Sequence, residues 1–352
     1  MKAKQNIFSV VALAAAISCM GVAHGAMQSF TALPSPNCGT TQTNNCVQFG
    51  DFSVYSLALL YTQATFASTG IIPTTNPNPG DPYYVKSAPG ELSQNGYIVY
   101  GTGTNNNNVV TNGAGTLIDD AQAQATGAVS SYVVGAGTET SPTFTGDSPT
   151  SWSGTLSAIR TELGAGSTPN GQFVIYFNLN ETGADGLAGI DLLTWLRVTL
   201  TDAQGILPNL DYYLTGNPGS TTAPSVTNNS DPNWVTAHGT ICVSATAGFL
   251  GFGPCTAGQT TLGGRNVNQN LGADAAAFAL YNADLSNMVL NSGYDYIQGN
   301  WQFSNINNGF EQQFSALATV NGVNRVPEPA TLGLLGLGLL GMGASLRKRK
   351  AA

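Results

Sequence analysis

The residue type best suited to acid–base chemistry, histidine, occurs only twice in the sequence, at His24 and His238. Nucleophilic hydrolysis needs a base beside the nucleophile. His238 lies in the segment Trp-Val-Thr-Ala-His-Gly, near no Gly-x-Ser-x-Gly motif. The sequence also has no His-Glu-x-x-His motif and no Cys–His arrangement. A lone histidine is more often structural than catalytic, so we expect that this protein is not an enzyme.

Carboxylates alone can support glycoside hydrolysis, which needs two of them at a defined separation. Residues 26–325 contain 18 acidic residues, of which only Asp119 and Asp120 are adjacent. Adjacent residues of a strand point to opposite faces, so this pair does not by itself form a catalytic pair. A polysaccharide-active glycosidase or lyase is therefore the least favoured function for this sequence.

Oxygen-rich side chains between residues 178 and 191 form the best candidate metal site. Asn178, Asn180, Glu181, Asp185 and Asp191 follow one apparent strand and precede the next. Calcium takes six to eight oxygen ligands, which suits such a loop, although the spacing matches neither an EF-hand nor a nonapeptide repeat. A solvated turn rich in Asn and Asp is the favoured alternative. We expect no other cofactor.

Four cysteines, Cys38, Cys46, Cys242 and Cys255, lie beyond the N-terminal segment that contains the fifth. An even number in an exported chain favours disulfides. Local pairing, Cys38 with Cys46 and Cys242 with Cys255, is the preferred one of three connectivities, and each bridge would stabilise the fold by about 2–3 kcal/mol. A zinc site is disfavoured because neither pair has Cys-x-x-Cys spacing and one histidine remains.

The segments that would position these residues have mostly strand character. Residues 172–179 have the apolar continuity of a strand buried on both faces. Residues 192–201 alternate, and only the set beginning at Leu192 is consistently core-like. Other expected strands are at 48–60, 96–100, 130–134, 211–214 and 294–303. Helices are expected from Ser151, with Trp152, Leu156, Ile159 and Leu163 on one face, and from Asp274 to Gly293, with Phe278, Tyr281, Leu285 and Met288 inward. The pattern predicts a mainly β, antiparallel β-sandwich or jelly-roll-like ectodomain over 26–325, with one or two short helices.

Aromatic side chains provide one candidate surface for binding sugars. The six candidates are Tyr212, Tyr213, Trp234, Tyr294, Tyr296 and Trp301. Flat aromatic faces can stack on sugar rings, but aromatics at strand spacing are more often core or cross-strand partners. Both interpretations stay open at this point.

The ectodomain is acidic and sparsely charged. Residues 26–325 carry five basic against 18 acidic side chains, a formal charge of −13, compared with −8 for the whole chain. Such a surface repels nucleic acid and anionic membranes, so nucleic acid is excluded as a partner.

Both ends of the chain have the features of targeting segments. Lys2 and Lys4 precede an apolar run, and small residues follow at 23–26, which predicts a secretory signal peptide over residues 1–25. At the other end, the uncharged residues 330–346 would span about 25 Å as a helix, the short end of a transmembrane length. The basic cluster Arg347, Lys348, Arg349 and Lys350 follows and would stay cytoplasmic.

The segment before this predicted transmembrane helix is Val326, Pro327, Glu328 and Pro329. Two prolines prevent a helix from continuing into the span, so the Pro-Glu-Pro stays extended outside the membrane. Together with the span and the basic cluster, residues 326–350 resemble the PEP-CTERM sorting signal of Gram-negative bacteria. A plain membrane anchor is the alternative.

The resemblance implies a place and a processing partner rather than an activity. PEP-CTERM proteins are substrates of exosortase, a membrane-embedded transpeptidase-like enzyme, and usually occur where exopolysaccharide and biofilm matrix are made. The resemblance therefore implies an inner-membrane stage, then a location at the cell surface or outside the cell, with polysaccharide as a further partner. Segments 152–160, 177–180 and 191–198 also resemble an ectodomain type found among PEP-CTERM proteins, for which the resemblance implies no catalytic residues.

We therefore expect a non-catalytic structural or interaction role in the exopolysaccharide or biofilm matrix. A carbohydrate-binding module, assisted or not by calcium, is the alternative.

Overall fold

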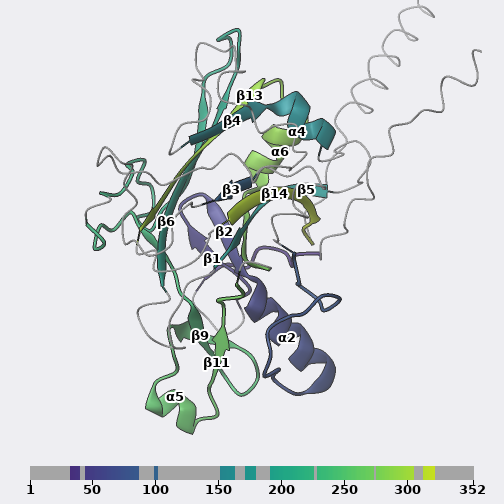
Figure 1. Cartoon of the computed structure of the whole chain (residues 1–352), viewed down its shortest axis with the longest axis vertical. Coiled ribbons are helices and arrows are strands. Elements are labelled where there is room, and N and C mark those ends of the chain that lie inside the picture. Colours follow the sequence, from purple (N-terminus) through teal and green to yellow (C-terminus); the bar gives the residue numbers. More distant parts are fainter. Residues whose placement is uncertain are drawn as a thin grey trace, which may run out of the picture.

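The computed structural model describes residues 32–39, 44–86, 99–101, 151–162, 171–179, 191–225, 228–272, 275–304 and 312–321. The protein is mainly β, with antiparallel sheets and few helices (Figure 1). The strands are β1 (Val47–Phe49), β2 (Phe52–Ser56), β3 (Val99–Gly101), β4 (Ser151–Thr155), β5 (Gly171–Asn178), β6 (Leu192–Thr201), β7 (Leu210–Leu214), β8 (Val235–Ala237), β9 (Thr240–Val243), β10 (Phe249–Phe252), β11 (Arg265–Asn268), β12 (Ala276–Tyr281), β13 (Tyr296–Ser304) and β14 (Gln312–Thr319). The helices are α2 (Leu57–Thr69), α4 (Leu156–Glu162), α5 (Ala257–Thr261) and α6 (Ala283–Asn291).

The largest sheet has the strand order β1-β2-β12-β5-β14-β3. Its strand β5 is buried at every position, as the continuous apolar sequence predicts. Alternation explains why, because Phe173 and Phe177 lie in one hydrophobic cluster while Val174 and Tyr176 lie in another on the opposite side. Both faces of this strand are therefore covered by protein.

The second sheet has the order β4-β13-β6-β7, and β8 also pairs with β6. Leu196 and Val198 of β6 point into the main core, as predicted. The sequence does not mark the alternate residues as consistently core-like, yet Leu193 and Trp195 of that set are buried in a small cluster with Trp234. The segment around Trp234 covers the outer face of β6 and removes these side chains from water.

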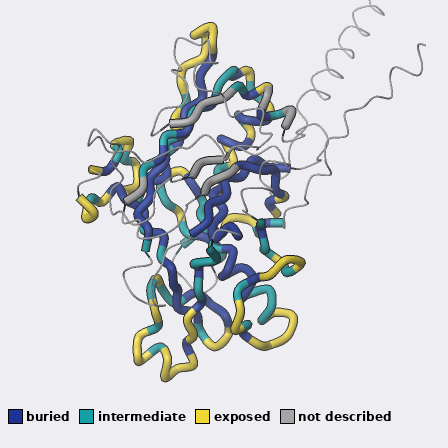
Figure 2. Tube along the Cα trace, viewed as in Figure 1, coloured by how far each residue is buried: buried dark blue, intermediate teal, exposed yellow. Residues whose placement is uncertain are grey.

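One hydrophobic core joins the two sheets. Phe177 and Phe278 of the first sheet stack with ring centroids 5.6 Å apart, and they share a cluster with Leu196 and Trp301 of the second. Figure 2 shows the buried residues along the central strands and the exposed ones at the loop tips. The jelly-roll arrangement stays a prediction.

Helix α6 closes one end of this core, and its predicted start at Asp274 is wrong. Residues 276–281 form β12 between β2 and β5, and the helix begins after Asn282, whose Oδ1 accepts a hydrogen bond from the Leu285 N–H at 2.7 Å. A run of apolar residues fits the period of a helix as well as that of a strand, so the sequence alone does not distinguish them. The place between β2 and β5 makes this run a strand.

Helix α4 likewise starts later than predicted. Residues 151–155 pair with β13 as strand β4, and the helix follows from Leu156. Arg160 of α4 donates from Nε to the carbonyl of Val289 at 2.6 Å and from Nη2 to that of Ser292 at 2.9 Å. The guanidinium thereby caps the C-terminus of α6 and links the two helices. Burial lowers the pKa of Arg160, partly offset by Asp295.

The strand predicted over 48–60 is correct only in part, because helix α2 begins at Leu57 and takes the last four residues of that span. Two short strands form first, β1 and β2, and the Ser56 side chain then caps the helix by accepting from the Leu59 N–H at 3.1 Å. The helix then runs through a segment that contains Leu, Ala, Tyr and Gln. Gly70 ends it in the left-handed conformation at φ 70°. The capping serine therefore starts a helix where the continuous apolar sequence alone predicts a strand.

The loop between β6 and β7 is organised by Asp202. Its carboxylate accepts hydrogen bonds from the backbone N–H groups of Gln204 (3.0 Å), Ile206 (2.7 Å) and Leu207 (2.9 Å). These bonds, the one from Leu207 first, lower the pKa of Asp202 from its usual 3.8.

A third sheet, β10-β9-β11, packs beside α2 at the end of the molecule where α5 lies (Figure 1). None of its strands is predicted from the sequence. No helix within the described residues is long and apolar enough to cross a membrane. The predicted strand at 130–134, the signal peptide over 1–25 and the transmembrane helix over 330–346 lie outside the described residues.

Candidate functional site

His238 and Asp191, which are 47 residues apart, meet beside the third sheet. His238 lies in the turn between β8 and β9, and Asp191 immediately precedes β6. The Nδ1 of His238 is 2.9 Å from Oδ2 of Asp191, while Oδ1 accepts from the Gly239 N–H at 3.1 Å. The two side chains are 24% and 28% exposed, so the pair faces solvent on one side.

The ring of His238 stacks on Phe252, with centroids 5.0 Å apart and planes inclined by 23°. Phe252 is 45% exposed and meets the buried Phe249 edge-on at 5.1 Å. Behind them lies an apolar pocket of about 60 Å³, to which all three sheets contribute, including Phe177, Ile241 and Phe252 itself. His238 is thus a polar group on the wall of an otherwise mainly hydrophobic hollow.

An imidazole whose Nδ1–H is held by a carboxylate has its Nε2 available to accept a proton. Among the residues that the structure describes, no serine, threonine or cysteine side chain is hydrogen-bonded to His238. The arrangement can therefore bind a hydrogen-bond donor, and it orients the one histidine that sequence analysis singled out.

A second pocket, named the polar pocket, lies on the other side of α2. It has a volume of about 180 Å³ and is lined by residues of α2, the loop after it and strands β9 and β11. Every polar side chain that lines it carries a neutral hydroxyl or amide, and these residues are Tyr61, Thr62, Thr74, Thr75, Asn76, Thr240, Asn266 and Asn268.

Strand pairing places the polar wall of this pocket. Thr240 of β9 is directly opposite Asn268 of β11, and Cys242 is opposite Asn266, so all four lie on one face of the sheet. The neighbouring Ile241 points to the other face, into the apolar pocket. Strand β9 therefore contributes Thr240 to the wall of the polar pocket and Ile241 to the wall of the apolar pocket.

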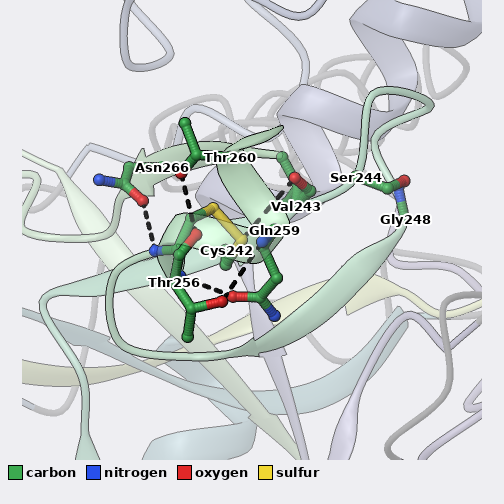
Figure 3. The surroundings of a disulfide bond; sticks show 9 residues. Cys242, Val243, Ser244, Gly248, Thr256, Gln259, Thr260 and Asn266 are labelled. Carbon is green, nitrogen blue, oxygen red and sulfur yellow. Dashed lines mark hydrogen bonds between the residues drawn. A yellow bond between two sulfur atoms is a disulfide. The ribbon is translucent and has the colours of Figure 1, made fainter. Parts of the chain in front are cut away.

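The disulfide between Cys242 and Cys255 lies next to Asn266, one of the residues that line the polar pocket. It joins β9 to the segment before α5, and the backbone N–H of Cys255 donates to Oδ1 of Asn266 at 2.7 Å (Figure 3). Thr256 and Gln259 form a capping box that begins α5 in the same picture. The second bridge, Cys38–Cys46, closes an eight-residue separation next to the apolar pocket. Both are the local pairs that the spacing favoured.

Comparison with known proteins gives two matches along the chain. A family model described as "Domain of unknown function (DUF8239)" matches residues 32–304, and a model of the PEP-CTERM protein-sorting motif matches residues 325–350. The chain belongs to the DUF8239 family. No curated protein and no solved structure matches it.

The sorting motif of this DUF8239 protein confirms the resemblance based on Val326 to Pro329 and on the basic cluster 347–350. The protein is exported, is sorted at the membrane and is processed by an exosortase-type enzyme. The motif itself lies outside the described residues.

Most aromatic residues considered for sugar stacking belong to the core of this DUF8239 domain. Trp301, Tyr212, Trp234 and Tyr294 are buried, so that interpretation is wrong for them. The Tyr212 hydroxyl donates to Oδ2 of Asp284 at 2.6 Å, and burial raises its pKa. These rings hold the sheets together instead of facing solvent.

The proposed calcium ligands are only partly described. Asn178 is buried at the end of β5, while both carboxylate oxygens of Asp191 are engaged by His238 and Gly239. Asn180, Glu181 and Asp185 lie outside the described residues. Calcium at this loop stays a prediction.

Proposed function

We propose that this protein acts without catalysis, as a structural or interaction component of the exopolysaccharide or biofilm matrix outside the cell. The observation that carries the proposal is the sorting motif at 325–350, close behind a disulfide-bonded β domain. A signal peptide over residues 1–25 and a transient inner-membrane span over 330–346 belong to the same proposal.

The chemistry of the domain suits an extracellular place. Its two disulfides are stable only where thiols are not kept reduced. Its formal charge of −13 over residues 26–325 keeps it apart from nucleic acid and anionic lipid. A neutral, hydrated polysaccharide is a partner that such a surface does not repel, and the polar pocket supports the narrower alternative of a carbohydrate-binding module.

Processing and location are tested together in the native host. Protein recovered from the cell surface should end near Pro327–Pro329 by intact mass and C-terminal mapping, and most of it should stay with the polysaccharide fraction after washing. Replacing both prolines by alanine should leave an uncleaved, membrane-bound chain, whereas Pro218→Ala, at an exposed loop position, should change nothing.

Two results would overturn the proposal. Protein found in the cytosol with free thiols contradicts export, and turnover of any matrix polysaccharide by the purified protein contradicts a non-catalytic role.

A further inference from the structure

We propose that the polar pocket between α2 and β11 binds one neutral sugar residue of a polysaccharide. The inference rests on the proposed function, because it names the site and the chemical class of ligand through which the exported domain holds its matrix. Three features of the pocket support it: oriented amide donors, a buried hydroxyl without a partner, and a wall without charge.

The amide donors are those of Asn266 and Asn268. The Oδ1 of Asn266 accepts from the Cys255 N–H at 2.7 Å, and the Oδ1 of Asn268 accepts from the Asn270 N–H at 2.9 Å. These contacts fix which side of each amide is oxygen. The Nδ2 groups are left as donors on the wall of the pocket, where sugar hydroxyl and ring oxygens can accept from them.

The hydroxyl belongs to Thr240, which is only 2% exposed and whose Oγ1 has no hydrogen-bond partner in the structure. A buried polar atom without a partner is costly, and most such atoms in native proteins have one. Thr240 lies opposite Asn268 and forms part of the pocket wall. A ligand hydroxyl that reaches this shielded atom, after a small local rearrangement of the pocket wall, would give it the missing bond.

The remaining wall suits a compact, uncharged ligand. Tyr61, Thr74 and Thr75 add hydroxyl groups that both donate and accept, and Pro73 and Pro77 flank the loop that carries the two threonines. With about 180 Å³, the pocket is smaller than the roughly 300–1,000 Å³ of sites for drug-sized ligands, so it accommodates one sugar ring.

Charge decides against an acidic sugar. No basic side chain lines the pocket to neutralise a uronate, and the domain around it is strongly acidic.

The experiment is a titration of the exported, disulfide-intact protein with glucose, galactose, mannose and N-acetylglucosamine, and with glucuronate and galacturonate. Saturation-transfer NMR detects binding, and the concentration dependence gives Kd. At least one neutral sugar should bind saturably, while the uronates should not.

Two variants place the site. Thr240→Val should weaken the neutral sugar about three- to tenfold, the effect of losing one neutral hydrogen bond. Thr194→Val is the matched control, because Thr194 is equally buried and its Oγ1 also lacks a partner, but it lines the apolar pocket. At the exposed rim, Thr74→Trp should block binding, and Thr222→Trp, at an exposed position elsewhere, should not.

Three outcomes would overturn the inference: no saturable binding of any neutral sugar, tighter binding of the uronates, or equal affinity in Thr240→Val and Thr194→Val. None of these outcomes concerns whether the protein stays in the polysaccharide fraction after washing. That fractionation tests the proposed function separately.

Discussion

Removing the disulfide between Cys242 and Cys255 should have two separable effects, on stability and on the polar pocket. The bridge closes a sequence separation of 13 residues, and loop-closure entropy for that length gives about 3 kcal/mol of stabilisation. The bridge between Cys38 and Cys46 closes a separation of eight, which gives about 2.5 kcal/mol. The double variant Cys242→Ala/Cys255→Ala should therefore unfold at a midpoint roughly 4–6 °C lower, close to the value for Cys38→Ala/Cys46→Ala.

The ligand assay separates the two variants. Only the Cys242–Cys255 bridge holds the segment whose N–H orients the Asn266 amide, so only its removal should weaken sugar binding at a temperature where both variants are folded. The stability part is measured by circular dichroism on heating and by urea titration. A loss below about 1 kcal/mol for either pair would refute the loop-entropy argument, and equal sugar affinity in both variants would refute the coupling to Asn266.

Three further predictions concern the scaffold and the calcium loop. Arg160→Met should destabilise the fold by about 1.5–3 kcal/mol, because the α6 carbonyls lose charged hydrogen-bond donors, while Arg265→Met at an exposed strand position should stay near zero in the same urea titration. Because the pKa of Asp202 is lowered in the fold, its carboxylate stabilises the fold fully above the usual pKa of 3.8, and this stabilisation is lost as the pH falls through the lower folded pKa. Between pH 6 and pH 3 the melting temperature of the wild type should therefore fall more than that of Asp202→Asn. Parallel curves of melting temperature against pH would contradict this. If the loop at 178–191 binds calcium, millimolar Ca²⁺ should raise the melting temperature relative to a chelator, and identical melts would remove the site.

The strands with the strongest patterns are predictable from the sequence. Residues 172–179 indicate a strand covered on both faces, because five consecutive apolar side chains occupy positions 173–177, and the alternation over 192–201 marks β6 equally well. The local disulfides follow from spacing in the same way. In these cases the local pattern and the final environment agree.

Other elements depend on neighbours that a local pattern does not reveal. The apolar residues from Phe278 onward have helical spacing, yet the first of them fill the position between β2 and β5 as a strand. Leu193 and Trp195 of β6 are buried because Trp234, almost 40 residues later, packs against them. Four-residue strands such as β9 and β11 are too short to show a period at all.

The two pockets are hidden from the sequence for the same reason. Thr240 and Asn268 become neighbours only through the register of β9 with β11, and His238 meets Asp191 only once β6 and β8 have paired. The one available signal is Asn266 and Asn268 at strand spacing in a polar segment, which places two amides on one face. It does not indicate what lies opposite them.

Strand β14 has an interior place in the largest sheet although it is the last strand of the described chain. It is inserted between β5 and β3, and just beyond it Val320 bridges to Leu33 near the beginning of the domain. Strand β14 therefore joins β3 to the rest of the sheet, and it ends only a few positions ahead of the sorting motif. The five residues from Val320 to the motif at 325 allow at most about 20 Å between the finished sheet and the segment that the exosortase-type enzyme processes.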